Sequence, residues 1–291
     1  MRGAGLAGGS DRAVRDAHAA GGQVTAGVPA AVAALTRLRP CLAAAGLGLG
    51  LAHVGEPGLC PAGPAEASAA ATMTPGRRRE FLAGREAARR ALRAVGVDCG
   101  EIPREGRLPV FAPGRSASIT HSAGIAVAVA RAPGEHAPLG CDLELRPLPC
   151  DAARLVLVPD EESLLGEPAT AGGGPWSLTG LFSAKEAAWK ALHLVPGPAG
   201  TASMRTLRDL RAEPYGDVLH IGPRIDRHVG PRIAPSSRPR IASRAGQSYG
   251  VRVRMRVQVR VLPVGAGVFS YVVGWADADG RSTPEPTARR S

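Results

Sequence analysis

The sequence contains few aromatic residues and very little lysine. Phenylalanine, tryptophan and tyrosine together make up 3% of the 291 residues, so few rings are present to stack on the bases of single-stranded nucleic acid. Only two of the 36 basic side chains are lysines, Lys185 and Lys190, and they flank the same glutamate, Glu186. Because an ammonium is a compact donor and a guanidinium is a planar fork, this segment is a candidate functional site.

Cysteine is also scarce, and its spacing argues against two further classes. The five cysteines are odd in number and show no C-x-x-C spacing, so neither a disulfide framework nor a zinc site is predicted. Asp11 and Arg12 stand where a secretory signal would have its apolar core. The apolar run Cys41–Val54 is short and rich in glycine for a membrane span. We therefore expect a cytoplasmic protein with no membrane partner.

The net charge of +11 is concentrated in one stretch of the chain. Residues 222–262 contain ten arginines and one acid, Asp226, which gives +9 and leaves +2 for the rest. This tract is the basis for one alternative function, a basic protein that binds RNA or DNA. A basic surface also suits an acidic protein partner through electrostatic steering, and we expect no nucleic-acid partner.

An acidic motif lies on a predicted strand. Apolar and other residues alternate over Leu139–Arg146, the period of a half-buried strand. Asp142 and Glu144 then project from one face, about 7 Å apart at a rise of ~3.3 Å per residue. Two carboxylates so placed can bind one Mg²⁺, which prefers oxygen ligands. The alternative interpretation is an edge strand with a solvated acidic face.

The segment with the two lysines has a structural interpretation beside the functional one. Ser183 and Glu186 have the spacing of a capping box at a helix start. Glu186 and Lys190 also form a favourable i, i+4 pair on a helix. Either feature would occur in an ordinary helix without any catalytic role.

His121 lies at a predicted turn between two strands. It follows Thr120, and the apolar run Ile125–Ala130 comes after Gly124, as in a buried strand. The histidine is either a turn residue with its hydrogen bonds satisfied or a donor that meets a phosphate at the strand end.

Taken together, these segments resemble the 4'-phosphopantetheinyl transferases of the larger, monomeric type, in particular the enterobactin-synthetase activators of siderophore biosynthesis. The family pattern is a Ser-His-Ser-like turn, then Gly-(Ile/Cys)-Asp-x-Glu, then (Trp/Phe)-Ser-x-Lys-Glu-x-x-x-Lys-Ala. Here it stands as Thr120–Ser122, Gly140–Glu144 and Phe182–Ala191, with threonine in place of the commoner first serine. Arg77–Arg89 is a weaker similarity, to the subgroup's first long helix.

The resemblance implies an α+β fold of two similar α/β subdomains, related by a pseudo-twofold axis, with the active site in the cleft between them. It implies an enzyme that moves the 4'-phosphopantetheine arm of coenzyme A to a serine of an apo acyl or peptidyl carrier protein and releases 3',5'-ADP. Such enzymes activate nonribosomal peptide and polyketide synthases in secondary metabolism. The partners would be coenzyme A and the carrier proteins, and the chain would be a monomer.

The resemblance also implies roles for individual residues. Mg²⁺, with Mn²⁺ as an alternative, would be held by Asp142, Glu144 and Glu186. Glu186 would be the general base, and Lys190 would neutralise charge on the phosphates. Coenzyme A would be bound by the following residues: Arg85, Arg89, Thr120, His121, Lys185 and Lys190.

The predicted organisation has an extension and two halves. Residues 1–40 are rich in alanine and glycine, and we expect a disordered extension or a wrongly placed start codon, with at most a short helix near Ala31–Leu38. The two halves would be 41–137 and 138–290, with a disordered insertion at 222–247. A helix should begin at Thr74, an N-cap followed by proline, and stop at Gly96.

One more alternative uses the same carboxylates: another Mg²⁺-dependent phosphotransferase, or a nuclease. A coenzyme A-dependent mass gain on a carrier protein would separate the transferase from both.

Overall fold

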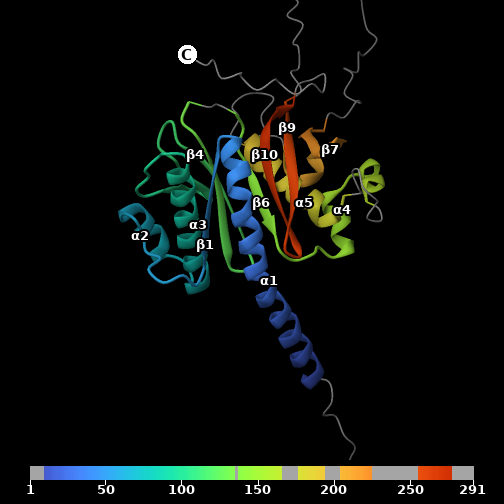
Figure 1. The fold of residues 1–291 in the computed structure, drawn as a ribbon. Helices are drawn as coiled ribbons and strands as arrows, with labels where there is room; N and C mark the ends of the chain where they lie inside the picture. Colours follow the sequence, from blue (N-terminus) through green and yellow to red (C-terminus); the bar gives the residue numbers. More distant parts are fainter. Residues whose placement is uncertain (1–9, 135–136, 166–175, 194–203, 225–254, 277–291) are drawn as a thin grey trace, which may run out of the picture.

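The fold is a mixed α+β arrangement of two main sheets with helices packed on them (Figure 1). The computed structural model describes residues 10–134, 137–165, 176–193, 204–224 and 255–276, with side chains from residue 27 onward. The α+β class expected from the sequence is confirmed. No helix in these described ranges is long and apolar enough to cross a membrane.

The first sheet is three-stranded and antiparallel, in the order β1-β5-β4. Helix α3 packs on one face of this sheet through a core rich in alanine. Glycine at two positions of β1 allows the close approach, because a Cβ at Gly50 would lie 2.0 Å from the carbonyl oxygen of Ala87. The elements of this half are β1 (Leu47–His53), α2 (Pro64–Ala71), α3 (Pro75–Ala94), β2 (Arg104–Glu105), β3 (Leu108–Pro109), β4 (Ser116–Ser122) and β5 (Ile125–Arg131).

Helix α3 has the ends that its sequence predicts. Thr74 is the N-cap residue and Pro75 the first helical residue, where the missing N–H of proline costs nothing. Gly96 follows the helix with a φ of +77°, a conformation that glycine adopts without a steric penalty.

The second sheet is five-stranded, in the order β6-β10-β9-β8-β7. Helix α5 covers one face of it, and its alanine and leucine side chains form a core with β8, β9 and β10. The elements of this half are β6 (Cys141–Glu144), η1 (Cys150–Ala152), α4 (Ala153–Val156), η2 (Pro159–Leu164), α5 (Leu178–His193), η4 (Leu207–Asp209), β7 (Leu210–Tyr215), β8 (Val218–Pro223), β9 (Arg256–Val264) and β10 (Gly267–Ala276).

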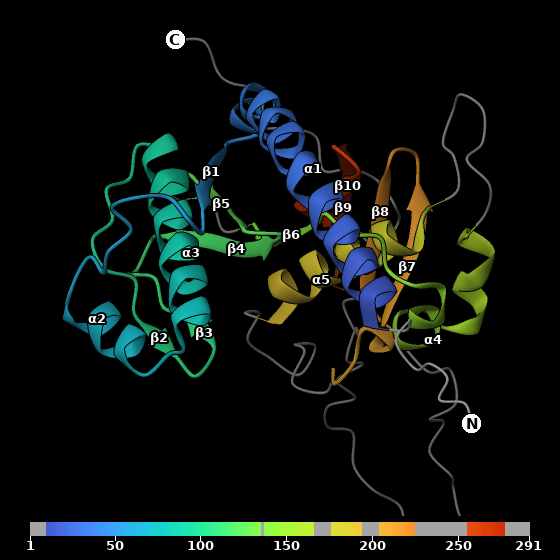
Figure 2. The same ribbon diagram turned by 90° about the horizontal axis from the view of Figure 1, so that it is seen from below.

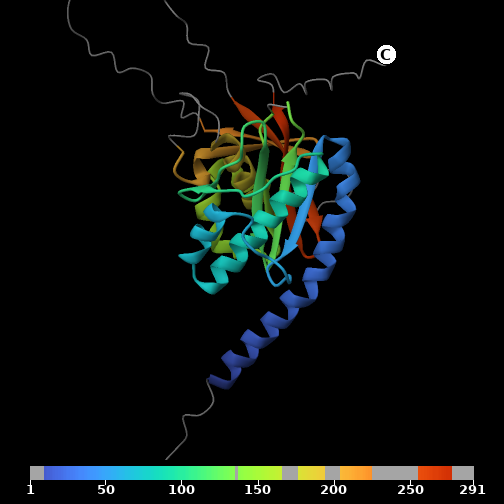
Figure 3. The same cartoon turned by 90° about the vertical axis from the view of Figure 1, so that its left-hand side faces the viewer.

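Helix α1 (Ser10–Ala44) differs from the extension expected for residues 1–40. It is a single long helix rather than a short one, and its last turns lie across both halves, while its first part projects beyond the body (Figures 1 and 3). Ala31, Leu35 and Leu42 are fully buried in a core that contains side chains of both sheets. Burial of this apolar face against β1 and β9 makes residues 27–44 an integral layer of the fold rather than a disordered extension.

The insertion expected at 222–247 is described only in its first residues. Residues 225–247 of the expected insertion lie outside the described residues, and its first two residues, Gly222 and Pro223, end strand β8. After this tract, β9 and β10 pair antiparallel as a hairpin.

Candidate functional site

The three predicted motifs lie on β4, β6 and α5, and β6 packs against both β4 and α5 (Figure 2). Thr120 and His121 come from the end of β4, Asp142 and Glu144 from β6, and Glu186 and Lys190 from α5. A glycine just before β6 permits the approach to α5, since a Cβ at Gly140 would lie 2.0 Å from the carbonyl oxygen of Ala187.

Asp142 is the centre of the polar contacts at this junction. Its Oδ1 accepts a hydrogen bond from Nζ of Lys190 at 2.7 Å and one from Oγ1 of Thr120 at 3.1 Å. Lys190 also donates to the carbonyl oxygen of Cys141 at 3.0 Å. Asp142 is only 4% exposed, and its Oδ2 is buried without a hydrogen-bond partner.

The other two carboxyl groups are destabilised in their charged forms. Burial, and then the charge of Asp142, raise the pKa of Glu144 to about 7. The same two causes raise the pKa of Glu186. Burial acts against the charge on Lys190, but Asp142, together with Cys141 and Glu186, outweighs it and raises the pKa of this lysine. The three carboxylates and the lysine therefore influence one another's charge. We call these four residues, Asp142, Glu144, Glu186 and Lys190, the Asp142 unit.

The carboxylates of this unit are of the chemical type that binds a divalent cation, although they are not grouped as a complete metal site. Within the described ranges, no three Asp, Glu, His or Cys side chains are grouped closely enough to hold a metal ion. However, Asp142 has one buried oxygen without a partner, and burial together with the charge of Asp142 raises the pKa of Glu144, a shift that a bound cation would oppose. Carboxylate oxygens are the ligands that Mg²⁺ prefers, so the donor set fits this ion.

His121 lies within β4, one residue before the strand ends, and not in the turn where the sequence placed it. Its Nε2 is 2.9 Å from Nη1 of Arg77. Because a guanidinium has no acceptor, Nε2 must accept this bond and the ring proton must be on Nδ1. Burial, opposed by Glu80 and assisted by Arg77, lowers the pKa of His121.

Lys185, a predicted coenzyme A ligand, lies in the protein interior. It is 0% exposed, and its ammonium donates to Glu161 Oε2 at 2.6 Å and to the carbonyl oxygens of Val156 and Leu210 at 2.9 and 3.0 Å. All three N–H donors of the ammonium are therefore used. Glu161 also accepts from the backbone N–H groups of Val158 and Ala212. This arrangement ties α5 to β7 and η2 and leaves no donor for a phosphate.

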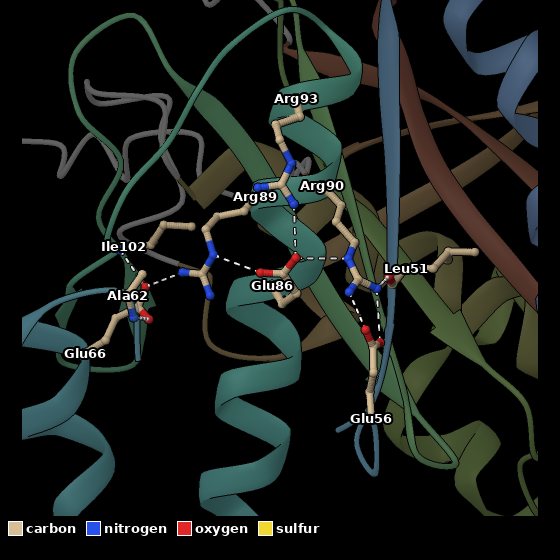
Figure 4. Close-up of polar contacts among 9 residues, drawn as sticks. All are labelled: Leu51, Glu56, Ala62, Glu66, Glu86, Arg89, Arg90, Arg93 and Ile102. Atoms are coloured by element: carbon tan, nitrogen blue, oxygen red, sulfur yellow. Dashed lines mark hydrogen bonds and ion pairs between the residues drawn. The ribbon is translucent and has the colours of Figure 1, made fainter. Parts of the chain in front are cut away.

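Helix α3 carries two further residues predicted to bind coenzyme A, Arg85 and Arg89, and both are also buried. Arg89 pairs with Glu66 at 2.8 Å and with Glu86 at 3.0 Å, in a network that Figure 4 shows. Arg85 donates to the carbonyl oxygen of Ile102 at 2.8 Å. Burial lowers its pKa to about 10. These contacts attach α2 and the loop after α3 to α3.

Two of the structural alternatives from the sequence are excluded here. A capping box at Ser183 is wrong, because α5 begins at Leu178 and Ser183 is fully buried within the helix. A fully solvated acidic face on β6 is also wrong, because Asp142 is buried and Glu144 is partly buried.

Sequence reasoning missed two residues that the structure places near the predicted ones. Arg77 was noted only as the first residue of the segment Arg77–Arg89, but it is exposed and contacts His121. Glu161 is one of three consecutive acids, and nothing in the sequence separates it from Asp160 or Glu162. Its pairing with Lys185 depends on a contact between segments 24 residues apart.

A comparison with protein families supports the resemblance for part of the chain. Residues 65–131 match the family model described as the 4'-phosphopantetheinyl transferase N-terminal domain. The match runs from α2 to the end of β5 and includes Thr120 and His121. It supports the phosphopantetheinyl transferase superfamily for this chain. No curated protein matches the chain significantly.

Proposed function

We propose that this protein is a 4'-phosphopantetheinyl transferase that moves the arm of coenzyme A to a serine of an apo acyl or peptidyl carrier protein. The observation that carries the proposal is the Asp142 unit, in which Thr120 and Lys190 hold one carboxylate oxygen while the other has no partner. The family match to residues 65–131 adds support, because it covers the strand that supplies Thr120.

The arrangement of the two sheets supports two similar subdomains with the site between them. Each sheet has one long helix on a face, and in each a glycine lets a helix carbonyl approach the strand. The strands of the first sheet lie within 41–137, and those of the second within 138–290. We infer a pseudo-twofold relation on this basis, with the active site at the junction of β4, β6 and α5, in a monomer.

The transfer forms a bond between the serine oxygen and the β-phosphorus of coenzyme A. The bond from that phosphorus to the bridging oxygen breaks, and 3',5'-ADP leaves. Such chemistry requires mainly positioning and neutralisation of charge. Glu186 takes the serine proton, and its raised pKa brings it closer to neutral pH, where a general base is most effective.

The remaining residues bind phosphate or hold the catalytic groups. Lys190 supplies positive charge beside the phosphates, and His121 donates from Nδ1. Exposed Arg77 is better placed for phosphate than buried Arg85 or Arg89. Lys185 has a structural role, since its donors are all used.

Mg²⁺, or Mn²⁺ in its place, would be held by Asp142, Glu144 and Glu186. When bound, the ion would act as a Lewis acid that neutralises charge on the pyrophosphate. The finer assignment, an enterobactin-synthetase-activator-like enzyme that serves siderophore, peptide or polyketide synthases, rests on the motif resemblance. The net positive charge of the chain suits carrier proteins with acidic surfaces.

Intact-mass spectrometry tests the proposal directly. With Mg²⁺ and coenzyme A, the purified chain should add a phosphopantetheine arm of roughly 340 Da to the carrier serine, as this transfer chemistry requires. The matched control is a carrier whose acceptor serine is replaced by alanine, which should gain no mass. No mass gain on any of several acyl and peptidyl carriers would refute the proposal.

A further inference from the structure

Strands β4 and β6 lie beside each other but belong to different sheets. They are joined by side-chain hydroxyls of β4, which accept hydrogen bonds from backbone N–H groups of β6 and of the residue that follows it. We call this set of contacts the hydroxyl seam. Its three bonds share an offset of 23 residues: Cys141 N to Ser118 Oγ at 3.0 Å, Leu143 N to Thr120 Oγ1 at 3.2 Å, and Leu145 N to Ser122 Oγ at 3.1 Å.

The alternation of β4 explains why hydroxyls are present at this seam. Ile119 lies on the face covered by α3, where a Cβ at Gly84 would be 3.2 Å from its Cγ2 atom. Ser118 and Thr120 therefore project from the opposite face, toward β6. Cys141 and Leu143 are 0% exposed, so their N–H groups need protein acceptors. An apolar side chain at these positions would leave a buried donor without a partner.

Thr120 differs from the other two hydroxyls because it also contacts a catalytic group. Its oxygen accepts from Leu143 N–H, and its single O–H donates to Oδ1 of Asp142 at 3.1 Å. One hydroxyl can fill both roles because it has one donor and two acceptor sites. The result is that the seam and the Asp142 carboxylate share one atom.

We propose that Thr120 is a positioning residue that acts through Asp142. It fixes one carboxylate oxygen against the hydroxyl seam, so that the second oxygen, Oδ2, stays directed away and without a protein partner. This gives Thr120 a role different from the coenzyme A contact predicted from the sequence. The turnover test of this inference rests on the proposed function, because it measures transfer of the phosphopantetheine arm.

The test compares three variants of the full chain. Thr120→Val keeps the shape but removes both hydrogen bonds, and Thr120→Ser keeps both. Ser118→Ala is the matched control, because it removes a bond of the hydroxyl seam without touching Asp142. We expect Thr120→Val to lower kcat about tenfold or more, with the KM for coenzyme A within about threefold. Thr120→Ser and Ser118→Ala should stay within about threefold of wild type in kcat.

Equal kcat in Thr120→Val and Ser118→Ala would show that the seam only stabilises the fold and would overturn the proposal. Crystal structures of the same two variants give a readout that needs no activity. The Asp142 carboxylate should rotate in Thr120→Val and remain in place in Ser118→Ala. A wild-type protein that transfers no arm would refute the proposed function, and the crystal structures would still decide this inference: an unmoved Asp142 in Thr120→Val overturns it.

Discussion

Nζ of Lys190 lies 2.7 Å from Oδ1 of Asp142, across the contact between α5 and β6. The two charges lie in a largely buried place, where their attraction is stronger than in water. Asp142 therefore stabilises the charged form of Lys190, whose pKa is raised although burial opposes it. Lys190 is nevertheless 29% exposed, so it remains accessible to a phosphate.

Lys190→Arg tests whether the shape of this cation matters. The ammonium reaches two oxygens at once, on Asp142 and on the carbonyl of Cys141, and a planar guanidinium cannot take its place without more room. We expect kcat to fall tenfold or more, about 1.4 kcal/mol in the barrier, in a steady-state transfer assay. If Lys190 were only a surface partner of Glu186, arginine would cost a few tenths of a kcal/mol, and turnover within about threefold would contradict a catalytic role.

Asp142→Ala and Glu186→Ala should separate catalytic from structural carboxylates. Burial raises the pKa of Glu186, and Oδ2 of Asp142 has no hydrogen-bond partner, so neither group is fully used by the fold. The 29% exposed Lys190 can be solvated when Asp142 is removed. Loss of either carboxylate should therefore reduce turnover by orders of magnitude while the melting temperature changes by only a few degrees. Activity and thermal unfolding would be measured on the same samples. Asp160→Ala is a matched control, because Asp160 forms an exposed ion pair with Arg211 and should leave both quantities nearly unchanged.

The opposite result would identify structural roles. If the two alanine variants keep their activity and lose about 0.5–2 kcal/mol of stability, as a lost cap would, these carboxylates do not belong to the catalytic site.

The contrast between the two lysines shows how far sequence reasoning could go. Residues five apart on a helix are separated by about 140° around its axis, so Lys185 and Lys190 could not share a face. Which of them is buried could not be known, because that depends on Glu161, whose segment packs on α5 only in the folded chain. The family motif contains both lysines and therefore suggested two ligands where the structure offers one.

Local patterns predicted the strand that carries Asp142 and both ends of α3, because alternation and capping act over a few residues. The role of Thr120 needed the position of β6 beside β4, which is a tertiary contact. Helix α1 was underestimated for the same reason. Its alanine-rich face gives a weak signal alone, and its burial depends on β1 and β9.

Lys185→Met should unfold the protein more readily than Lys190→Met, and Lys190→Met should lose more activity. Removing one partner of a fully buried ion pair leaves the charge of Glu161 uncompensated, which costs about 3–5 kcal/mol. Urea denaturation would measure the stability of each variant, and transfer rates would be expressed per folded molecule. Equal stability of the two variants would contradict the structural role of Lys185.

The last prediction concerns the protonation of His121. In the free protein its pKa is lowered, first by burial, and Nε2 accepts from Arg77. A bound phosphate would favour the imidazolium, so coenzyme A should raise this pKa. The complex then binds more protons than the free protein between the two pKa values, and affinity for coenzyme A should increase as the pH falls through that window.

Proton–nitrogen correlation spectra of the imidazole, recorded over pH with and without coenzyme A, would measure this shift. His220 is the internal control, because burial also lowers its pKa but it lies on β8, where it stacks on Tyr215. Its titration should be the same in both series. An upward shift for His121 alone places it at the phosphate. Equal behaviour of the two histidines would contradict that contact, because a phosphate within hydrogen-bonding distance must favour the charged ring.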